Sequence, residues 1–262
     1  MDQKWLEEQK EEIGLALAKQ GIRLVVPVEK QSRKRSSASA EDSTLASFID
    51  HTLLKPTASQ AQITQICQEA LDYHFASVCV NPVHVPIAAR ILRDSDVRVC
   101  TVIGFPLGAT STLTKVLEAR DAVAAGAEEI DMVLNIGSLL ERDYARVYSD
   151  IKAVRDAVSG QVLKVILETG YLSKEQIVRG CILAKMAGAD FVKTSTGFGP
   201  GGATVEDVSL MREVVGPDCG VKASGGIRDV ASALAMIKAG ANRLGASSGV
   251  AIIEGLRGEA DY

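Results

Sequence analysis

Four charged residues interrupt short stretches of the chain that are otherwise apolar. They are Asp131, Lys164, Lys193 and Lys222. A charge that is buried without a partner destabilises a protein strongly, so such residues persist mainly where function requires them. The alternative is a set of structural ion pairs, in which Asp131 balances one lysine. Even with Glu168 as a second carboxylate, three lysines would be incompletely balanced, which favours the functional interpretation.

Paired lysines beside a carboxylate suit covalent amine catalysis. A free lysine has a pKa near 10.4, so a nucleophilic lysine needs a pKa lower by about 3 units, equivalent to roughly 4 kcal/mol. A second lysine close by and a partly dry pocket can supply that. The amine then attacks a carbonyl, and the resulting iminium acidifies the adjacent carbon while neighbouring groups move protons. Aldol formation and cleavage are the natural reactions of such a site.

Eight apolar or β-branched runs, each followed by a helical pattern, must position these residues. The runs are Phe48–Thr52, Ala76–Val80, Val97–Ile103, Glu129–Leu134, Leu163–Glu168, Phe191–Ser195, Gly220–Ser224 and Arg243–Ala246. Capping boxes that begin at Ser59 and Ser173 predict two helix starts, and glycines at 126, 188 and 240 predict helix ends. Eight such units predict a parallel (β/α)₈ barrel of the TIM type. An open doubly wound sheet is the alternative, but it would place ligands at one switch point.

Alternation along the strands assigns the charged residues to the barrel interior. Lys193 shares a strand face with Phe191 and Ser195, and Lys222 shares one with Ser224. Strands of a closed parallel barrel have helices outside and packed side chains inside, so both faces should be almost wholly apolar. An ammonium group would be worse placed among helix-packing residues than in the interior. We therefore expect Lys193 and Lys222 to face the lumen.

Glycine and serine clusters follow the seventh and eighth runs. They are Ser224-Gly225-Gly226 and Gly245-Ala246-Ser247-Ser248-Gly249. In β/α barrels the loops after strands 7 and 8 often hold a phosphate, because glycine lets backbone N–H groups approach the anion. The two clusters together predict a phosphate site, although ordinary turn chemistry is the alternative.

Residues 1–44 differ from the barrel that we expect over residues 45–262. Leu6, Ile13 and Leu17 share one helical face, which predicts an N-terminal amphipathic helix from Asp2 to Lys19. The stretch from Gln31 to Thr44 is rich in serine, alanine and charge, and it predicts a flexible linker rather than a nucleic-acid-binding arm.

The composition limits the classes of function. The 262 residues are 47% hydrophobic with a formal net charge of −4, which gives no electrostatic reason to expect nucleic acid or a membrane as partner. No apolar stretch is long enough for a membrane span or resembles a signal core, so we expect a cytoplasmic protein. The five cysteines show no close pairing and there are only three histidines, so we expect neither a metal nor a cofactor.

With these residues in view, the sequence resembles the deoxyribose-phosphate aldolase family over roughly Leu45 to Gly249. The resemblance rests on the strings IDHTLLKP (Ile49–Pro56), SVCVNP (Ser77–Pro82), VIGFPLG (Val102–Gly108), EIDMVLN (Glu129–Asn135), LKVILETG (Leu163–Gly170), FVKTSTGFG (Phe191–Gly199), VKASGGIR (Val221–Arg228) and LGASSG (Leu244–Gly249). It implies reversible cleavage of 2-deoxy-D-ribose 5-phosphate to acetaldehyde and D-glyceraldehyde 3-phosphate.

The resemblance also implies roles for individual residues. Lys193 would form the Schiff base, Lys222 would be the second lysine that favours the neutral amine of its neighbour, and Asp131 would relay protons through water. The residues expected to hold the phosphate are Gly225, Gly226, Ser247 and Ser248. The supporting residues implied by the family pattern are Asp50 and Lys164, which orient groups, and Thr52 and Thr196, which contact substrate.

The chain departs from some family members near its ends and at the phosphate site. The extension before Leu45 carries no catalytic motif, and we expect it to pack on the barrel or on a neighbouring subunit. Phe198 stands where some members carry a lysine near the phosphate, and Lys55 or Arg228 are the candidates to compensate. Tyr262 ends the chain, and terminal tyrosines of some members enter the site as proton donors; a simple tail residue is the alternative.

Two rival functions remain at this point. One is another Schiff-base barrel aldolase with a different donor, and the other is a non-catalytic barrel that binds a sugar phosphate. The combination of Asp131, Lys193 and Lys222 argues against the second, because binding alone needs no paired lysines. The expected partners are a sugar phosphate and an aldehyde, with a homodimer as the family-level expectation.

Overall fold

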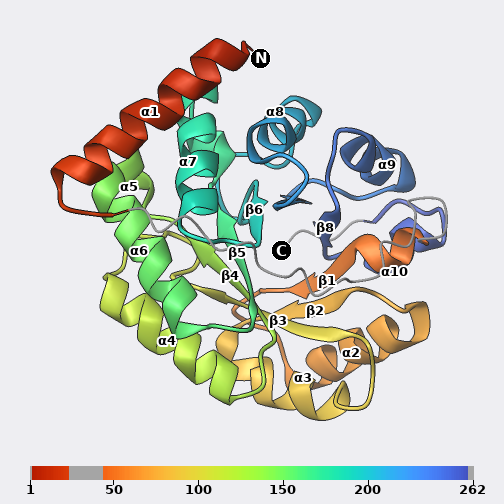
Figure 1. Ribbon diagram of the computed structural model, residues 1–262. Helices are drawn as coiled ribbons and strands as arrows, with labels where there is room; N and C mark the ends of the chain where they lie inside the picture. Colours follow the sequence, from red (N-terminus) through yellow and green to blue (C-terminus); the bar gives the residue numbers. More distant parts are fainter. Residues whose placement is uncertain (1, 24–43, 259–262) are drawn as a thin grey trace.

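The computed structural model describes residues 2–23 and 44–258. Eight parallel strands pair in chain order and close into a barrel, with β1 hydrogen-bonded to both β2 and β8 (Figure 1). The strands are β1 (Ile49–Leu53), β2 (Ser77–Val80), β3 (Arg98–Ile103), β4 (Glu129–Val133), β5 (Val162–Ile166), β6 (Phe191–Lys193), β7 (Gly220–Ser224) and β8 (Arg243–Ala246). The predicted TIM barrel is therefore confirmed.

Helices surround the strands and cover their outer face (Figure 1). They are α1 (Gln3–Lys19), α2 (Gln60–Tyr73), α3 (Val85–Ile91), α4 (Thr112–Ala124), α5 (Ile136–Leu140), α6 (Tyr144–Ala157), α7 (Lys174–Met186), α8 (Val205–Val215), α9 (Val230–Lys238) and α10 (Gly249–Ile253). Short 3₁₀ turns lie at Leu45–Phe48, Pro82–His84 and Thr169–Tyr171.

Local signals in the sequence explain where these elements begin and end. Ser59 and Ser173 each form the predicted capping box at the start of α2 and α7. Glycines 126, 188 and 240 have positive φ angles of 111°, 88° and 110°, and each lies in the short turn between a helix and the next strand. The fifth and sixth strands end two residues earlier than expected, and after the fifth Glu168 turns the chain with a φ of 58°.

The apolar residues form two separate clusters. The larger cluster lies between the strands and the surrounding helices and includes residues such as Ile130, Val165 and Leu244. The smaller one comprises Leu54, Cys79, Cys100 and Val102, with Phe105 packed against it. Its members alternate with outward-facing strand residues, so the smaller cluster lies in the barrel lumen.

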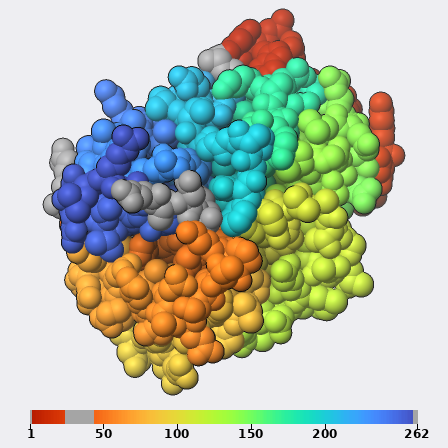
Figure 2. Space-filling view, turned by 180° about the vertical axis from the view of Figure 1, so that it is seen from behind, coloured from red at the N-terminus to blue at the C-terminus, as the bar shows by residue number. Residues whose placement is uncertain are grey.

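Helix α1 packs against the outside of the barrel, over α6 and α7 (Figures 1 and 2). Leu6, Ile13 and Leu17 are buried on its inner face, as the helical periodicity predicts. Arg179 of α7 donates to the side chain of Gln9 at 2.8 Å and pairs with Glu12 at 3.2 Å. The linker expected from Gln31 to Thr44 lies outside the described residues, apart from its last residue.

Within the ranges 2–23 and 44–258, no helix combines the length and apolar character that crossing a bilayer requires.

Candidate active site

Strand register brings the predicted charged side chains to one part of the lumen. Asp131 on β4 is paired with Lys164 on β5, and Lys193 on β6 is paired with Lys222 on β7. Side chains two residues apart on a strand share a face, and direct partners on neighbouring strands lie side by side. Their side chains therefore converge although 91 residues separate Asp131 from Lys222 along the chain.

Asp131 lies at the centre of the cluster and accepts from all three lysines. The Nζ atom of Lys164 donates to Oδ1 at 2.7 Å, and those of Lys193 and Lys222 donate to Oδ2 at 2.9 and 2.8 Å. Asp131 has no solvent exposure, and neither have Lys164 and Lys222, whereas Lys193 retains 3%. Lys193, the residue expected to react, is thus the one lysine of these three that has any solvent exposure.

A second layer of charges lies on the other side of these lysines. Arg243 on β8 donates to Asp50 Oδ1 at 2.6 Å and to Glu129 Oε2 at 3.1 Å. Asp50 also pairs with Lys222 at 2.5 Å, and Glu129 pairs with Lys164 at 2.7 Å. The lysines are therefore balanced more fully than the sequence indicated, and by Asp50 and Glu129 rather than by Glu168.

Sequence reasoning missed Glu129 and Arg243. Glu129 has the same strand parity as Asp131, so alternation along β4 was the available signal. Arg243 begins the eighth run, where a charged residue is ordinarily read as the solvated end of a strand. Nothing local distinguishes it, because its carboxylate partners come from β1 and β4.

The charge network determines which groups remain ionised. Burial alone would raise the pKa of Asp131, but Lys164, Lys193 and Lys222 outweigh burial and hold this pKa well below its usual value. In the same way, burial opposes the charged form of Lys222, but Asp131 and Asp50 raise its pKa well above the ordinary lysine value. Lys222 is therefore an ammonium and Asp131 a carboxylate at neutral pH.

The three lysines differ in how firmly carboxylates hold them. Lys164 contacts Glu129 and Asp131 at 2.7 Å and lies 3.8 Å from Asp50. Lys222 contacts Asp50 and Asp131. Lys193 has Asp131 as its one carboxylate contact within the described residues. Lys193 is therefore the lysine of the cluster that the fewest carboxylates hold.

Two buried thiols border the same cluster. Cys79 and Cys100 are direct partners on β2 and β3, and the Cys100 sulfur lies 3.3 Å from both Lys164 Nζ and Asp131 Oδ1. Their sulfurs and nearby carboxylates lie within 4.8 Å of one another, as metal ligands would. Burial raises the pKa of Cys100 well above its usual value, which disfavours the thiolate that binds metals, whereas a hydrogen bond from Cys100 lowers the pKa of Cys79. The expected absence of a metal stays a prediction.

The two threonines among the supporting residues lie in different parts of the barrel, one on a strand and one in a loop. Thr52 follows Asp50 on the same face of β1 and donates its hydroxyl to the carbonyl of Asp50 at 2.8 Å. Thr196 lies in the loop after β6, and its hydroxyl and N–H both donate to Glu168. Burial raises the pKa of Glu168, against the hydrogen bonds from Thr196. Glu168 thus joins two loops at the mouth of the barrel.

The expected phosphate residues lie on one rim, because β7 and β8 are neighbours with Ser224 paired to Gly245. Gly225 and Gly226 have φ angles of 85° and 81°, and a Cβ atom at Gly226 would meet no atom within 4 Å. Ser248 precedes α10 and is 8% exposed. Gly258 approaches Ser248 closely and donates to the carbonyl of Arg228 at 2.9 Å. Tyr262 lies outside the described residues.

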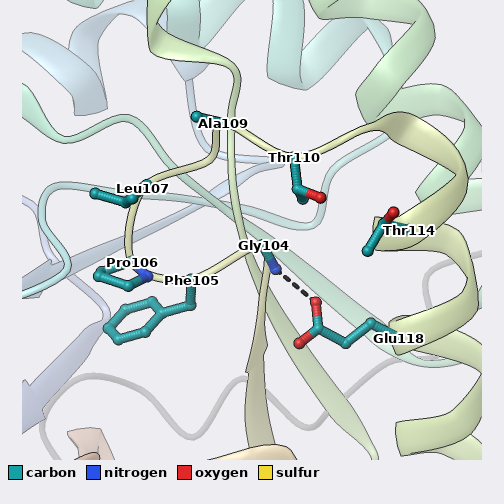
Figure 3. A pocket seen from close by; sticks show the side chains of 8 residues that line it. All are labelled: Gly104, Phe105, Pro106, Leu107, Ala109, Thr110, Thr114 and Glu118. Carbon is teal, nitrogen blue, oxygen red and sulfur yellow. Dashed lines mark hydrogen bonds between the residues drawn. The ribbon is translucent and has the colours of Figure 1, made fainter.

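The loops after β3 and β6 contact each other beside the mouth. Phe105, which packs on the lumen cluster, and Phe198 form an edge-to-face pair with ring centroids 5.4 Å apart. The loop after β3 is anchored by the N–H of Gly104, which donates to Glu118 on α4 at 2.7 Å (Figure 3). The pocket drawn there lies between this loop and α4, and none of the lumen lysines lines it.

His51 faces away from the lumen. It lies between Asp50 and Thr52 on β1, so its side chain has the opposite parity, and its Nε2 contacts Glu69 on α2 at 2.6 Å. His51 therefore lies between β1 and α2, because strand alternation directs it towards the helix layer.

Comparison with known proteins identifies the family. The DeoC/LacD family aldolase model matches residues 44–255. Deoxyribose-phosphate aldolase of Clostridium perfringens is 58% identical over 219 residues, covering 83% of this chain and 98% of that protein. Deoxyribose-phosphate aldolase 1 of Bacillus licheniformis is 59% identical over 219 residues, with the same coverage.

Solved structures give the same relationship. A putative deoxyribose-phosphate aldolase from Coccidioides immitis has 43% identity and a TM-score of 0.80, covering 94% of this chain and 96% of that one. A tetrameric deoxyribose phosphate aldolase from Aeropyrum pernix has 37% identity and a TM-score of 0.75, covering 80% of this chain and 89% of that one. With a closed barrel, a buried lysine cluster and relatives of this similarity, the chain belongs to the DeoC/LacD family of aldolases.

Proposed function

We propose that this chain is a deoxyribose-phosphate aldolase that uses Lys193 as its nucleophile. It cleaves 2-deoxy-D-ribose 5-phosphate reversibly to acetaldehyde and D-glyceraldehyde 3-phosphate through a lysine Schiff base. The observation that carries the assignment of roles is the unequal pairing of three lysines around Asp131. Lys164 and Lys222 each contact two carboxylates, whereas Lys193 contacts one and keeps some exposure.

Cleavage begins when the neutral amine of Lys193 attacks the C1 aldehyde of the open-chain sugar. Loss of water from the carbinolamine gives an iminium, which withdraws electrons from the C2–C3 bond. Removal of the proton from the C3 hydroxyl then breaks this bond, releases glyceraldehyde 3-phosphate and leaves an enamine on Lys193. Protonation of the enamine at C2 and hydrolysis of the new iminium release acetaldehyde and restore the amine.

Asp131 and Lys222 are the proposed proton carriers. Asp131 is ionised and contacts Lys193 directly, so it accepts a proton and passes it through water. Lys222 is an ammonium on the same carboxylate oxygen as Lys193, which supplies a proton and opposes a second positive charge on its neighbour. Lys164 and Asp50 orient these groups from below.

The remaining predicted residues bind the rest of the substrate. The proposed phosphate ligands are Gly225, Gly226, Ser247 and Ser248, from the loops after β7 and β8. Thr52 and Thr196 contact the sugar hydroxyls, and Lys55 or Arg228 supply positive charge in place of the lysine that Phe198 replaces. A proton-donating role for Tyr262 and the division of the chain at residue 44 remain part of the proposal.

Trapping the Schiff base tests this assignment. The protein is incubated with acetaldehyde and borohydride, digested, and mapped by mass spectrometry for the reduced two-carbon adduct. We expect the adduct on Lys193 and its loss in Lys193→Met. Lys115→Met is the matched control, because Lys115 is also fully buried and ion-paired but lies outside the lumen, with Asp150 at 2.6 Å.

Two results would overturn the assignment. One is the absence of any adduct, and the other is an adduct on Lys164 or Lys222 in place of Lys193. Loss of activity with a chelator would indicate metal-dependent chemistry instead.

Assembly and location are finer parts of the same proposal. We propose a homodimer in the cytoplasm, acting on a sugar phosphate and an aldehyde without nucleic acid or membrane. Light scattering after size-exclusion chromatography decides the subunit number, and a tetramer, as in the structure from Aeropyrum pernix, would replace the dimer.

A further inference from the structure

The buried charges of the lumen are unequal in number. Among the described residues, the basic side chains of the connected cluster that are at most 3% exposed are four, Lys164, Lys193, Lys222 and Arg243. It has three carboxylates, Asp50, Glu129 and Asp131. If every group is ionised, one positive charge has no carboxylate to balance it. Buried charge of this kind is relieved when the most weakly held group gives up its proton.

Arg243 is the basic group that cannot do so. A guanidinium stays protonated in proteins, and this one is 3% exposed with hydrogen bonds to two carboxylates. The ring of Phe191 covers it, with the guanidinium carbon 5.6 Å from the ring centroid. Gly220 leaves room for that ring, since a Cβ atom there would lie 2.2 Å from it. The site therefore fixes this cation firmly although it is remote from the mouth.

We propose that Arg243 is a positioning residue that keeps Lys193 in its neutral, nucleophilic form. Arg243 forms ion pairs with Asp50 and Glu129, and these carboxylates then stabilise the ammonium forms of the lysines less. The cluster is then neutral as a whole when Lys193 alone has lost its proton. The inference rests on the proposed function, because it explains how the Schiff-base lysine becomes reactive.

Four further titratable side chains face the cluster without an ion pair to its lysines. Arg98 reaches Glu129 at 3.7 Å from the start of β3, but its side chain is 31% exposed, so water screens its charge. Cys79 and Cys100 are buried; burial raises the pKa of Cys100, which remains a neutral thiol, whereas a hydrogen bond from Cys100 and the charges of Lys222 and Lys193 lower the pKa of Cys79 against burial. Glu168 approaches from the loop after β5, and burial raises its pKa against the hydrogen bonds from Thr196 and the charge of Lys193, which favours its neutral acid.

Loss of a proton from Lys164 or Lys222 in place of Lys193 is disfavoured. Lys164 and Lys222 each contact two carboxylates, and those carboxylates raise their pKa values above the ordinary value despite burial. Neither has solvent exposure through which a carbonyl could reach it. The excess positive charge is therefore relieved at Lys193, beside the mouth of the barrel.

Replacing Arg243 with a neutral residue tests the inference. The rate at which acetaldehyde is trapped on Lys193 by cyanoborohydride is measured from pH 5 to 9, since acetaldehyde has no titrating group of its own. In Arg243→Gln the three lysines face three carboxylates, so Lys193 keeps its proton. We expect the acid limb of the rate profile to move up by about 1 pH unit, a roughly tenfold loss of trapping below the limb.

Companion variants separate charge from folding. Arg243→Lys keeps the positive charge, so the acid limb of its rate profile should lie at the same pH as in the wild-type protein. The double variant Arg243→Gln/Glu129→Gln removes one charge of each sign and should return the limb to its wild-type position. Glu129→Gln alone keeps Arg243 and should move the limb down. Arg155→Gln is the matched control, because Arg155 is a buried arginine paired with Asp190 at 2.6 Å outside the lumen.

Each outcome decides the inference. A wild-type limb in Arg243→Gln, or an equal upward shift in the double variant, would overturn it. If Arg243→Gln fails to fold, the downward shift in Glu129→Gln still tests it, and an unchanged limb there would contradict it. Failure of the proposed function is distinguishable, because it would remove trapping on Lys193 from the wild-type protein itself.

Discussion

Replacing Asp131 with asparagine removes the carboxylate on which three lysines converge. At 2.7–2.9 Å and an effective dielectric constant of 20, each contact corresponds to about 6 kcal/mol of gross Coulomb energy. Much of this offsets the desolvation of the buried ions, and removing one partner of a buried pair typically costs about 3–5 kcal/mol. Since three cations lose a partner together, we expect the upper part of this range.

Urea unfolding and activity measure the two consequences separately. With an m value of about 3 kcal/mol/M, the loss in stability corresponds to a midpoint lower by roughly 1–2 M urea. Loss of the proton carrier should also lower kcat by about 10²–10⁴-fold at pH 7, the usual contribution of a positioned acid or base. The change should appear in kcat more than in KM, because Asp131 lies among the lumen lysines rather than at the rim proposed to bind phosphate.

Asp150→Asn is the matched control for Asp131→Asn. Asp150 is buried, and Lys115 donates to it at 2.6 Å, but the pair joins α4 to α6 outside the lumen. We expect it to lower stability while kcat stays close to the wild-type value. The reasoning would be refuted if Asp131→Asn kept wild-type stability and kcat, or if Asp150→Asn lowered kcat to the same extent.

Three further predictions concern the mouth, the rim and the N-terminal helix. Because burial raises the pKa of Glu168, folding favours its protonated form, and this stabilisation is present below the unfolded pKa and lost as pH rises through the folded pKa. The wild-type protein should therefore gain unfolding free energy as the pH is lowered, and Glu168→Gln should lack this gain. Urea titrations of both proteins at several pH values measure the difference. Gly226→Ala, at a φ of 81°, should lower kcat/KM for the phosphorylated sugar about tenfold more than for unphosphorylated deoxyribose; an equal loss for both would contradict the phosphate assignment. Leu17→Ala, at a fully buried position, should raise amide exchange across Gln3–Lys19 without changing kcat/KM, whereas Leu15→Ala, 56% exposed, should change neither.

Most of the fold could be predicted because its signals are local. The capping boxes at Ser59 and Ser173, the positive-φ glycines after helices and the β-branched runs each act within a few residues. Eight repeats of the same pattern then left few architectures to consider. The strand ends near Glu168 and Lys193 were less accurate, because the turn there depends on contacts between the loops after β5 and β6.

The candidate site could be predicted only in part. A charge inside an apolar run is visible in the sequence, so Asp131, Lys164, Lys193 and Lys222 could be recognised. The partners of those charges could not, because Glu129 and Arg243 stand at strand starts, where a charged residue is ordinary.

The sequence by itself determined the number and order of the strands, the lumen face of the lysines and the family to which they belong. These depend on periodicity and on strings of neighbouring residues. Only the tertiary structure decided how the lysines share the carboxylates, since each contact depends on the register of strands far apart in the chain. That sharing distinguishes Lys193 from Lys164 and Lys222, because proximity in space, and not position along the chain, determines how many carboxylates surround each amine.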